Sequence, residues 1–476
     1  MDQRTNITTP AGYEALETAR KRAYEWLASI DERPVGALAT PAQLRAQLTK
    51  TLTDEGIDPV VVVDELARDV EGGLHAVCGP RFFGWVMGGT LPASLAADWL
   101  CSAWDQNAGM FAVAPATAIV EEVAGAWLKD VLRLPKDASF AFVTGCQAAH
   151  TTGLAAARHA LLKRRGWDVE ADGLAGAPKL RILTSTEVHT TVARAARLLG
   201  MGSKAIEHLD VDEDGRLRVD VLRAKLAARD APTIVVLQAG DLNLGRFDDF
   251  ATIVPIAHEA GAWVHVDGAF GLWAAVSDKR RHLLKGVEDC DSWATDAHKW
   301  LNVPYDCGLA FVADVEAHSN AMSARASYMM KEADAVREQL DFTPEFSRRA
   351  RGFAVYAALR ELGRKGLTEL IDRTSDICRA LAYGIGALDG AERLTDPEIN
   401  QALVRFLDPK PGATEADHAR RTDAVIAQIN QGGEGFFGGV DWRGKRAMRI
   451  SVVSWRTREE DVSRTVAAVR AAMAAA

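Results

Sequence analysis

A lysine at the end of a short apolar segment is the residue of this 476-residue chain best suited to covalent chemistry. Lys299 follows the stretch Asp291-Ser-Trp-Ala-Thr-Asp-Ala-His298 and is flanked by bulky apolar residues. Burial removes water from an ammonium group, so we expect a lowered pKa that makes the Lys299 amine a nucleophile. A lysine that reaches from a strand end to solvent is the simpler interpretation.

An acid lies at the end of another apolar segment, 32 residues before that lysine. Asp267 closes the stretch Trp263-Val-His-Val-Asp267. A buried carboxylate without a partner is costly, and a protonated ring nitrogen would both satisfy it and become an electron sink. A helix N-cap or a metal ligand remains an alternative. No second acid or histidine is placed to favour a metal, so we expect none.

Two further stretches could hold the rest of a planar, phosphorylated cofactor. Phe142-Val-Thr-Gly145-Cys-Gln-Ala-Ala-His150-Thr-Thr152 reads as a strand, a turn of small residues and a helix, whose free N–H groups suit a phosphate. The GxxxxGK[ST] and GxGxxG patterns are absent, which disfavours a nucleotide. His189 follows a predicted strand and could stack on a ring, although a single histidine is more often structural.

These features occur in a consistent order: phosphate turn, stacking histidine, ring-nitrogen acid and nucleophilic lysine. Their agreement predicts pyridoxal 5'-phosphate, held as a Schiff base on Lys299, and chemistry at the α-carbon of an amino acid.

Alternating strands and helices must position these residues. Helical stretches separate most of the apolar runs, which predicts an α/β fold with a mostly parallel sheet, and ligands bind such sheets at the carboxyl ends of the strands. The strands are expected at Phe140–Thr144, Arg181–Ser185, Ile234–Gln238, Trp263–Asp267, Ser292–Thr295 and Gly308–Val312. The intervening helices are expected at Thr152–Lys163, Thr190–Leu199, Val219–Ala228 and Phe250–Ala260.

The two ends of the chain have a different pattern. The first residues read as helices with apolar positions three to four apart, and the chain after Arg351 combines long helices with two short strands. We therefore expect a helical N-terminal arm (1–85), a large cofactor-binding domain (86–350) and a small α+β C-terminal domain (351–476).

Composition narrows the partners and the location. A net charge of −9 and the lack of a basic tract argue against nucleic acid. Six scattered cysteines without a CxxC pair indicate neither a zinc knuckle nor a disulfide framework, which fits the cytoplasm. The polar N-terminus predicts no secretory signal, and no run of about 18 apolar residues predicts a membrane span.

The quoted motifs resemble one family over nearly the whole chain, from about residue 15 to 470. Pro80-Arg-Phe-Phe-Gly-Trp85, His189, His265-Val-Asp267-Gly-Ala269 and the stretch 291–307 are similar to the group II pyridoxal-phosphate-dependent amino-acid decarboxylases, such as aromatic-L-amino-acid decarboxylase. The resemblance implies fold type I, the aspartate-aminotransferase-like fold, and an obligate homodimer with its site at the interface.

The resemblance also implies residue roles. Lys299 carries the cofactor, Asp267 pairs with the ring nitrogen, Ala269 packs on one ring face, and His189 stacks on the other. The family usually has a hydroxyl residue in the phosphate turn, where this chain has Gly145-Cys-Gln-Ala, so backbone N–H groups with Thr151 or Thr152 are expected to take more of the phosphate. Further cofactor contacts are implied for Gln147, Ala148, Ser292, His298 and Asn243.

Reaction type rests on one tyrosine. Tyr328 lies 30 residues after His298, which matches the mobile catalytic loop of aromatic-amino-acid decarboxylases, where a tyrosine protonates the α-carbon after CO₂ leaves. Aldehyde-forming relatives carry Phe there, or Asn at the stacking histidine. The resemblance thus implies decarboxylation to the amine, with an aldehyde-forming enzyme or an aminotransferase as the alternative. An ordinary loop tyrosine also remains open.

The substrate is expected to be an aromatic L-amino acid. By resemblance, Phe82 and Trp85 fall near the side-chain pocket, and their stretch is apolar and aromatic. Trp104 opens a facing stretch, Trp104–Met110, whose polar residues could instead recognise a polar side chain.

Overall fold

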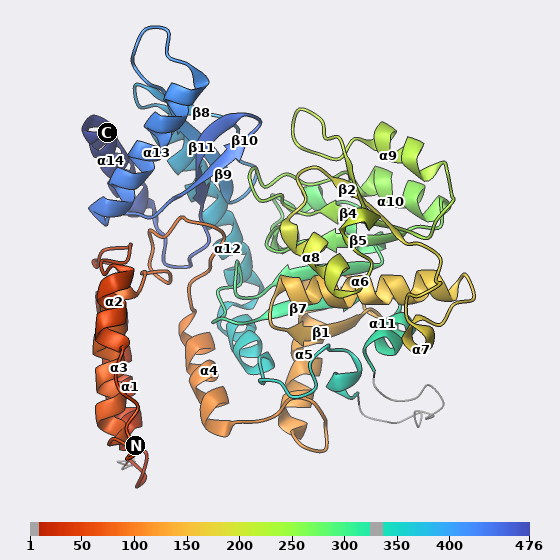
Figure 1. The fold of residues 1–476 in the computed structure, drawn as a ribbon, viewed down its shortest axis with the longest axis horizontal. Helices are drawn as coiled ribbons and strands as arrows, with labels where there is room; N and C mark the ends of the chain where they lie inside the picture. The colour runs from red at the N-terminus through yellow and green to blue at the C-terminus, as the bar shows by residue number, and fades with distance from the viewer. Residues whose placement is uncertain (1–8, 324–336) are drawn as a thin grey trace.

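Two β-sheets organise the protein, and the larger one carries the predicted site (Figure 1). The structure is a computed structural model that describes residues 9–323 and 337–476. The larger sheet has seven strands in the order β1-β7-β6-β5-β4-β2-β3. Neighbours from β3 to β6 are parallel, and β7 lies antiparallel between β1 and β6. The strands are β1 (Ser139–Val143), β2 (Arg181–Ser185), β3 (Ile206–Leu209), β4 (Thr233–Gln238), β5 (Trp263–Asp267), β6 (Ser292–Asp296) and β7 (Gly308–Val312).

Helices cover both faces of this sheet because its central strands are apolar on both sides. In β4, Ile234 and Val236 pack with the helices of one face, and Val235 and Leu237 pack with those of the other. The expected α/β fold with a mostly parallel sheet is therefore confirmed. The first face holds α6 (Cys146–Lys163) and α8 (Thr190–Leu198), and the second holds α9 (Val219–Leu226) and α10 (Phe250–Glu259).

Two local predictions for this domain were incomplete. Helix α6 begins at Cys146, six residues before the expected start at Thr152, so the predicted phosphate turn is largely the first turn of the helix. Strand β3, with the sequence Ile-Glu-His-Leu, was not predicted because its two central residues are polar. Two short α-helices, α7 (Val169–Asp172) and α11 (Val315–Met322), also belong to this part of the chain, as do short 3-10 helices such as Gly271–Val276.

The chain after residue 351 builds the second sheet, whose four strands are all antiparallel in the order β10-β11-β9-β8. Apolar residues of this sheet and of three helices form a separate core. The first helix is interrupted at Gly363, where φ is 57°. The elements are α12 (Gly352–Gly386), β8 (Ala391–Arg393), β9 (Gln401–Phe406), α13 (Glu415–Gly432), β10 (Gly438–Trp442), β11 (Lys445–Ser451) and α14 (Glu459–Ala475).

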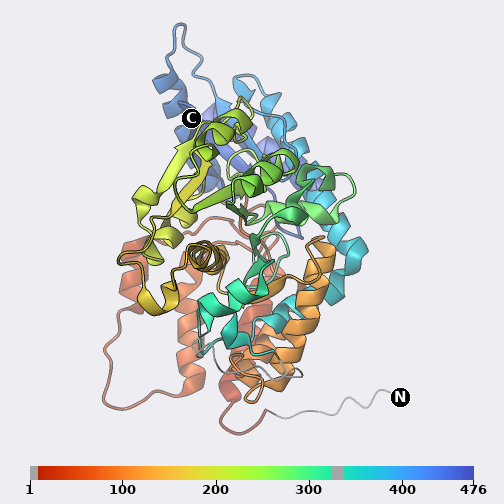
Figure 2. The same cartoon turned by 90° about the vertical axis from the view of Figure 1, so that its right-hand side faces the viewer.

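Helices of the N-terminal part lie beside the body of the protein, below the second sheet in both views (Figures 1 and 2). An ion pair of 2.6 Å between Arg22 and Asp64 joins α1 to α3, and the ring of Tyr24 lies 6.2 Å from that of Trp99 in α4. The domain boundaries at 85 and 350 stay predictions. These helices are α1 (Glu14–Ser29), α2 (Pro41–Leu48), α3 (Pro59–Val70) and α4 (Pro92–Trp104). The next helix, α5 (Pro115–Val131), instead contributes Ala124 and Leu128 to the core of the large sheet.

Among the described residues, no helix has the length and apolar character that crossing a membrane requires.

Candidate active site

The lysine and the acid lie at the same edge of the large sheet, as the sequence predicts. Asp267 is the last residue of β5 and is paired with Gln238 in β4 and Ala294 in β6. Lys299 follows the end of β6 by three residues. Since β4, β5 and β6 are parallel, their carboxyl ends form one edge of the sheet, and both residues lie at that edge.

Lys299 has a carboxylate partner that the sequence analysis did not consider. Its Nζ lies 3.1 Å from Oδ2 of Asp296, and its side chain is 23% exposed. Burial lowers the pKa of Lys299, as expected, but the negative charges of Asp296 and other nearby groups outweigh burial. The net pKa is raised above its ordinary value, so the expectation of a lowered pKa is wrong.

Asp296 connects the lysine to the first turn of α6. Its Oδ1 accepts a hydrogen bond of 2.6 Å from the backbone N–H of Cys146 and lies 3.5 Å from Nε2 of His298. A carboxylate at a helix N-terminus is stabilised by the free N–H groups there. The spacing of Asp296 and Lys299, three residues apart, was the signal that could have identified this acid.

A glycine fixes how closely the N-terminal segment approaches the lysine. A Cβ at Gly88 would stand 2.0 Å from the backbone oxygen of Lys299, closer than any real contact. The segment that carries Phe82 and Trp85 therefore runs directly against the turn that carries the lysine.

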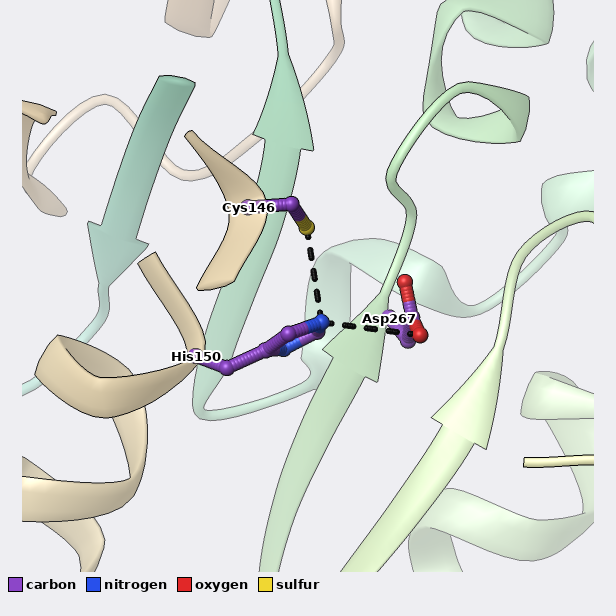
Figure 3. A group of neighbouring side chains, drawn as sticks. All are labelled: Cys146, His150 and Asp267. Carbon is purple, nitrogen blue, oxygen red and sulfur yellow. Dashed lines mark hydrogen bonds and ion pairs between the residues drawn. The ribbon is translucent and has the colours of Figure 1, made fainter. Parts of the chain in front are cut away.

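The acid of the site has a partner behind it (Figure 3). One oxygen of Asp267 accepts from the N–H of Ala269 at 3.2 Å, and the other lies 3.5 Å from Nε2 of His150. Burial acts to raise the pKa of Asp267, but the proximity of His150, together with His189 and Lys299, depresses it well below the usual range. The sequence showed no histidine placed with this acid to favour a metal, whereas the fold brings His150 beside it.

His189 lies at the start of α8, where Nδ1 accepts from the backbone N–H of Thr191 at 3.3 Å. Burial lowers its pKa, opposed by the charge of Asp267 and assisted by that of Lys299. The lowered pKa favours the uncharged imidazole, which can stack on a ring without the cost of burying a charge. The influence of Asp267 and Lys299 on this pKa shows that His189 lies near both residues.

The first turn of α6 carries a buried polar side chain without a partner. Both amide atoms of Gln147 are buried and have no hydrogen-bond partner among the described residues. The N–H groups of Gln147 and Ala148 belong to the first helical turn, where intrahelical partners are missing. The hydroxyls of Thr151 and Thr152 donate at 3.0 Å to the carbonyls of Gln147 and Ala148. A phosphate contact from either hydroxyl would replace one of these bonds, and it stays a prediction.

Two other predicted contacts lie at this edge of the sheet. His298 adjoins Lys299, stacks on Tyr305 with 4.3 Å between ring centres, and accepts from the N–H of Cys307. Asn243 follows β4, and its side-chain oxygen is buried without a partner among the described residues.

Ser292 does not lie with these residues. It begins β6, at the opposite end of the strand, and is fully buried. Its hydroxyl is engaged by Trp263 and His265 at 2.9 and 2.8 Å. The prediction that Ser292 holds the phosphate is therefore wrong, because its hydroxyl is already committed inside the protein.

The three predicted substrate residues fall into two groups. Phe82 stacks on Phe436 with 5.0 Å between parallel rings, and Trp85 lies 5.6 Å from the same ring. Trp104 instead contacts Phe353 at 5.0 Å. Tyr328 lies outside the described residues.

Arg449 of β11 is a charged residue that the sequence analysis missed. Its guanidinium is buried, and Nε has no hydrogen-bond partner among the described residues. Burial lowers its pKa to about 10, opposed by the charge of Asp241, and its charge acts on His189. A cation in an apolar strand was the available signal.

These groups fit pyridoxal 5'-phosphate. Lys299 would hold its aldehyde carbon, Asp267 its ring nitrogen and His189 one ring face. The free N–H groups and the unpartnered amide of Gln147 suit its phosphate.

Comparison with known proteins gives a consistent result. Residues 41–407 match the pyridoxal-dependent decarboxylase conserved domain. An aromatic-L-amino-acid decarboxylase of Bacillus atrophaeus is 24% identical over 97% of this chain and 94% of its own length. A 4-hydroxyphenylacetaldehyde synthase of Rhodiola rosea is 26% identical over 96% of this chain and 95% of its own length. An acidic amino acid decarboxylase of Mus musculus is 29% identical over 78% of this chain and 68% of its own length. A crystal structure titled as Oryza sativa TDC with PLP and tryptamine shares the fold, with a TM-score of 0.90, 23% identity and 99% of both chains covered.

Proposed function

Since this chain belongs to the pyridoxal-dependent decarboxylase family, we propose that it removes the α-carboxylate of an aromatic L-amino acid as CO₂ and releases the amine. The observation that carries the proposal is the joint position of Lys299, Asp267 and His189 at one sheet edge. When bound, pyridoxal phosphate supplies an electron sink for the pair left when a bond to the α-carbon breaks.

The residues of the chain divide the remaining work. Asp267, kept ionised in its buried position, would accept a hydrogen bond from a protonated ring nitrogen. His189, with its lowered pKa, offers an uncharged ring face. Arg449 offers a buried positive charge that a substrate carboxylate would neutralise. Tyr328 is proposed to deliver the proton to the α-carbon.

Support for an aromatic substrate comes from the aromatic cluster of Phe82, Trp85 and Phe436. Trp85 is 54% exposed and has a φ of 49°, an uncommon conformation for a bulky residue that recurs at functional sites. Gly88, three residues later, adjoins Lys299. An aromatic decarboxylase and a structure with tryptamine among the relatives agree with this substrate class.

The alternative product is an aldehyde, and the Rhodiola relative named a 4-hydroxyphenylacetaldehyde synthase is the observation that favours it. The presence of both His189 and Tyr328 supports the amine instead.

One experiment distinguishes these outcomes. Cofactor-loaded protein is incubated with each of the common amino acids, DOPA and 5-hydroxytryptophan, and CO₂, amine, aldehyde and keto acid are quantified together. Equal amounts of CO₂ and amine from aromatic substrates support the proposal. Aldehyde from the wild-type chain would show an aldehyde-forming enzyme instead. Keto acid without CO₂ would show an aminotransferase. With Tyr328→Phe, amine should fall and aldehyde should rise.

We further propose that the protein acts as a homodimer in the cytoplasm. Exposed apolar side chains on α1, α3 and α4 support the dimer, because such surface is usually covered in the functional assembly. They include Leu16, Tyr24, Val61, Val62, Leu66, Trp99 and Leu100. Six free cysteines, five of them buried, are consistent with a reducing compartment.

A further inference from the structure

A line of buried polar side chains crosses the sheet behind the acid of the site. Trp263 donates to the Ser292 hydroxyl at 2.9 Å, and that hydroxyl lies 2.8 Å from Nδ1 of His265. Nε2 of His265 lies 2.9 Å from Nδ1 of His150, whose Nε2 is 3.5 Å from Asp267. We call the first four side chains the relay. None of them is more than 1% exposed.

Local geometry explains why the relay forms. Residues 263, 265 and 267 alternate along β5 and therefore face the same side of the sheet, toward α6. His265 and Ser292 are register partners in adjacent strands. On α6, a Cβ at Gly153 would stand 2.7 Å from the His265 ring, so the glycine leaves the space that this ring fills.

Each link has a direction that follows from the one before it. An indole N–H only donates, so the Ser292 hydroxyl accepts from Trp263. Its own buried proton then has one acceptor among the described partners, Nδ1 of His265, and we assign the hydrogen bond in that direction. His265 is then protonated on Nε2 alone, in agreement with burial, which lowers its pKa to about 3. Its Nε2–H therefore donates to Nδ1 of His150.

The relay thus ends in a donor aimed at the acid. With Nδ1 accepting, His150 carries its proton on Nε2, which faces both Asp267 at 3.5 Å and the Cys146 sulfur at 3.4 Å (Figure 3). A donor at this position favours the carboxylate over the carboxylic acid.

We propose that His150 is a positioning residue whose Nε2–H, oriented by His265, Ser292 and Trp263, holds Asp267 in the ionised form that pairs with the protonated ring nitrogen of the cofactor. The proposal depends on the family's cofactor and is independent of the substrate.

A metal ion is the competing occupant. Cys146, His150 and Asp267 offer three possible ligand atoms within 4.8 Å of one another. A nitrogen that bears a proton cannot ligate, so a metal at Nε2 would require every link to reverse and would leave the Ser292 proton without its acceptor.

The test uses the full-length protein loaded with pyridoxal phosphate labelled with ¹⁵N in the ring. The ¹⁵N chemical shift reports whether the ring nitrogen is protonated, and equilibrium dialysis gives the cofactor dissociation constant. Neither readout requires turnover, so failure of the substrate proposal leaves this test intact.

Four variants separate the relay from general packing. Ser292→Ala breaks the relay at its far end, and His150→Phe removes the final donor. His150→Gln restores an N–H that can reach Asp267. Ser94→Ala is the matched control, because this equally buried hydroxyl donates only to the Ala354 carbonyl.

His150→Phe should shift the ring nitrogen toward the unprotonated form and weaken cofactor binding by roughly tenfold. Ser292→Ala should act in the same direction with a smaller shift, His150→Gln should recover most of the wild-type signal, and Ser94→Ala should match wild type. If His150→Phe does not fold, the proposal is tested by the other two variants: Ser292→Ala should lower ring-nitrogen protonation, and His150→Gln should keep it near the wild-type level.

An unchanged ring-nitrogen signal and dissociation constant in both His150→Phe and Ser292→Ala would overturn the proposal. Stoichiometric zinc in the purified wild-type chain, lost in His150→Phe, would overturn it in favour of the metal site.

Discussion

At Lys299 the same surroundings that bury the amine also supply a counter-charge. Asp296 lies 3.1 Å from Nζ and holds the pKa of the lysine above its usual range. A charged ammonium cannot attack an aldehyde, so a proton must leave Nζ before the cofactor is joined to the chain. Asp296, three positions before Lys299, therefore influences how readily the lysine loses its proton and attacks the aldehyde.

Replacement of Asp296 should make cofactor attachment faster. A raised pKa leaves a small neutral fraction of Lys299 near pH 7, and that fraction grows as pH rises toward the pKa. Asp296→Asn removes the counter-charge while burial remains, so the pKa falls and the rate profile should move to lower pH. Reconstitution is followed by the absorbance at about 420 nm expected of a pyridoxal Schiff base.

Two controls accompany this measurement. Lys299→Ala should show no such band, and a persistent band would contradict the assignment of this lysine. Circular dichroism of Asp296→Asn tests whether loss of the contact to Cys146 disturbs α6. An unchanged pH profile in a folded Asp296→Asn protein would contradict the electrostatic account.

At the level of elements, contacts between different segments fix the large sheet, both at the site and at the opposite end of the strands. The segment around Gly88 touches the turn after β6, and α10 is tied to the start of β6 by an ion pair of 3.0 Å between His258 and Asp291. The first contact positions the lysine, and the second fixes a helix against the sheet.

Gly88→Ala should damage the site. The new Cβ would meet backbone rather than a movable side chain, so the turn that carries Lys299 must shift, at a cost of about 1–3 kcal/mol for overpacking. We expect lower stability in urea and weaker cofactor binding. Gly56→Ala is the matched control, since its Cβ would meet nothing within 4 Å. Equal behaviour of the two variants would refute the contact.

The His258–Asp291 pair should stabilise the protein only at low pH. The hydrogen bond to Asp291 raises the pKa of His258 above its usual 6.5, so its contribution is complete below that value and is lost as pH rises through the folded-state pKa. The pair is partly exposed, so His258→Gln should cost about 0.5 kcal/mol at about pH 5.5 and nothing at about pH 9.

Urea unfolding at both pH values measures this difference, with His282→Gln as a control on an exposed residue. A cost that is the same at both pH values would show that charge is not responsible.

At the scale of the whole molecule, the sequence predicted the architecture better than the site. Strands such as β4 and β5 were found because they are short apolar runs, whereas β3 escaped because its central residues are polar. Lys299, Asp267 and His189 were found because each lies at or shortly after the carboxyl end of an apolar strand. The relay was invisible because it joins residues 115 positions apart, His150 and His265, which no spacing rule connects. Ser292 was misassigned because its hydroxyl partners, Trp263 and His265, are also far from it in the sequence.

Assembly can be tested at this scale. Leu66 is 56% exposed on α3, and a charge there should disfavour burial of the N-terminal helices against a second copy. By light scattering, the wild-type chain should have about twice the 51.4 kDa mass of one chain, and Leu66→Glu should shift the population toward monomer. Leu198→Glu, at an exposed leucine of α8, should remain dimeric. A monomeric wild-type chain would contradict the proposed homodimer.

The insertion of β7 between β1 and β6 has a consequence for synthesis. Ser139 of β1 pairs with Val312 of β7, 173 residues later, so β1 leaves the ribosome long before its partner exists. At about 5–20 residues per second that wait lasts roughly 10 to 30 s. Meanwhile β1 stands without its strand neighbour, because β7 is the strand it pairs with in the sheet. The nascent chain is therefore a natural client for chaperones, and a pause in translation before residue 312 should increase its aggregation.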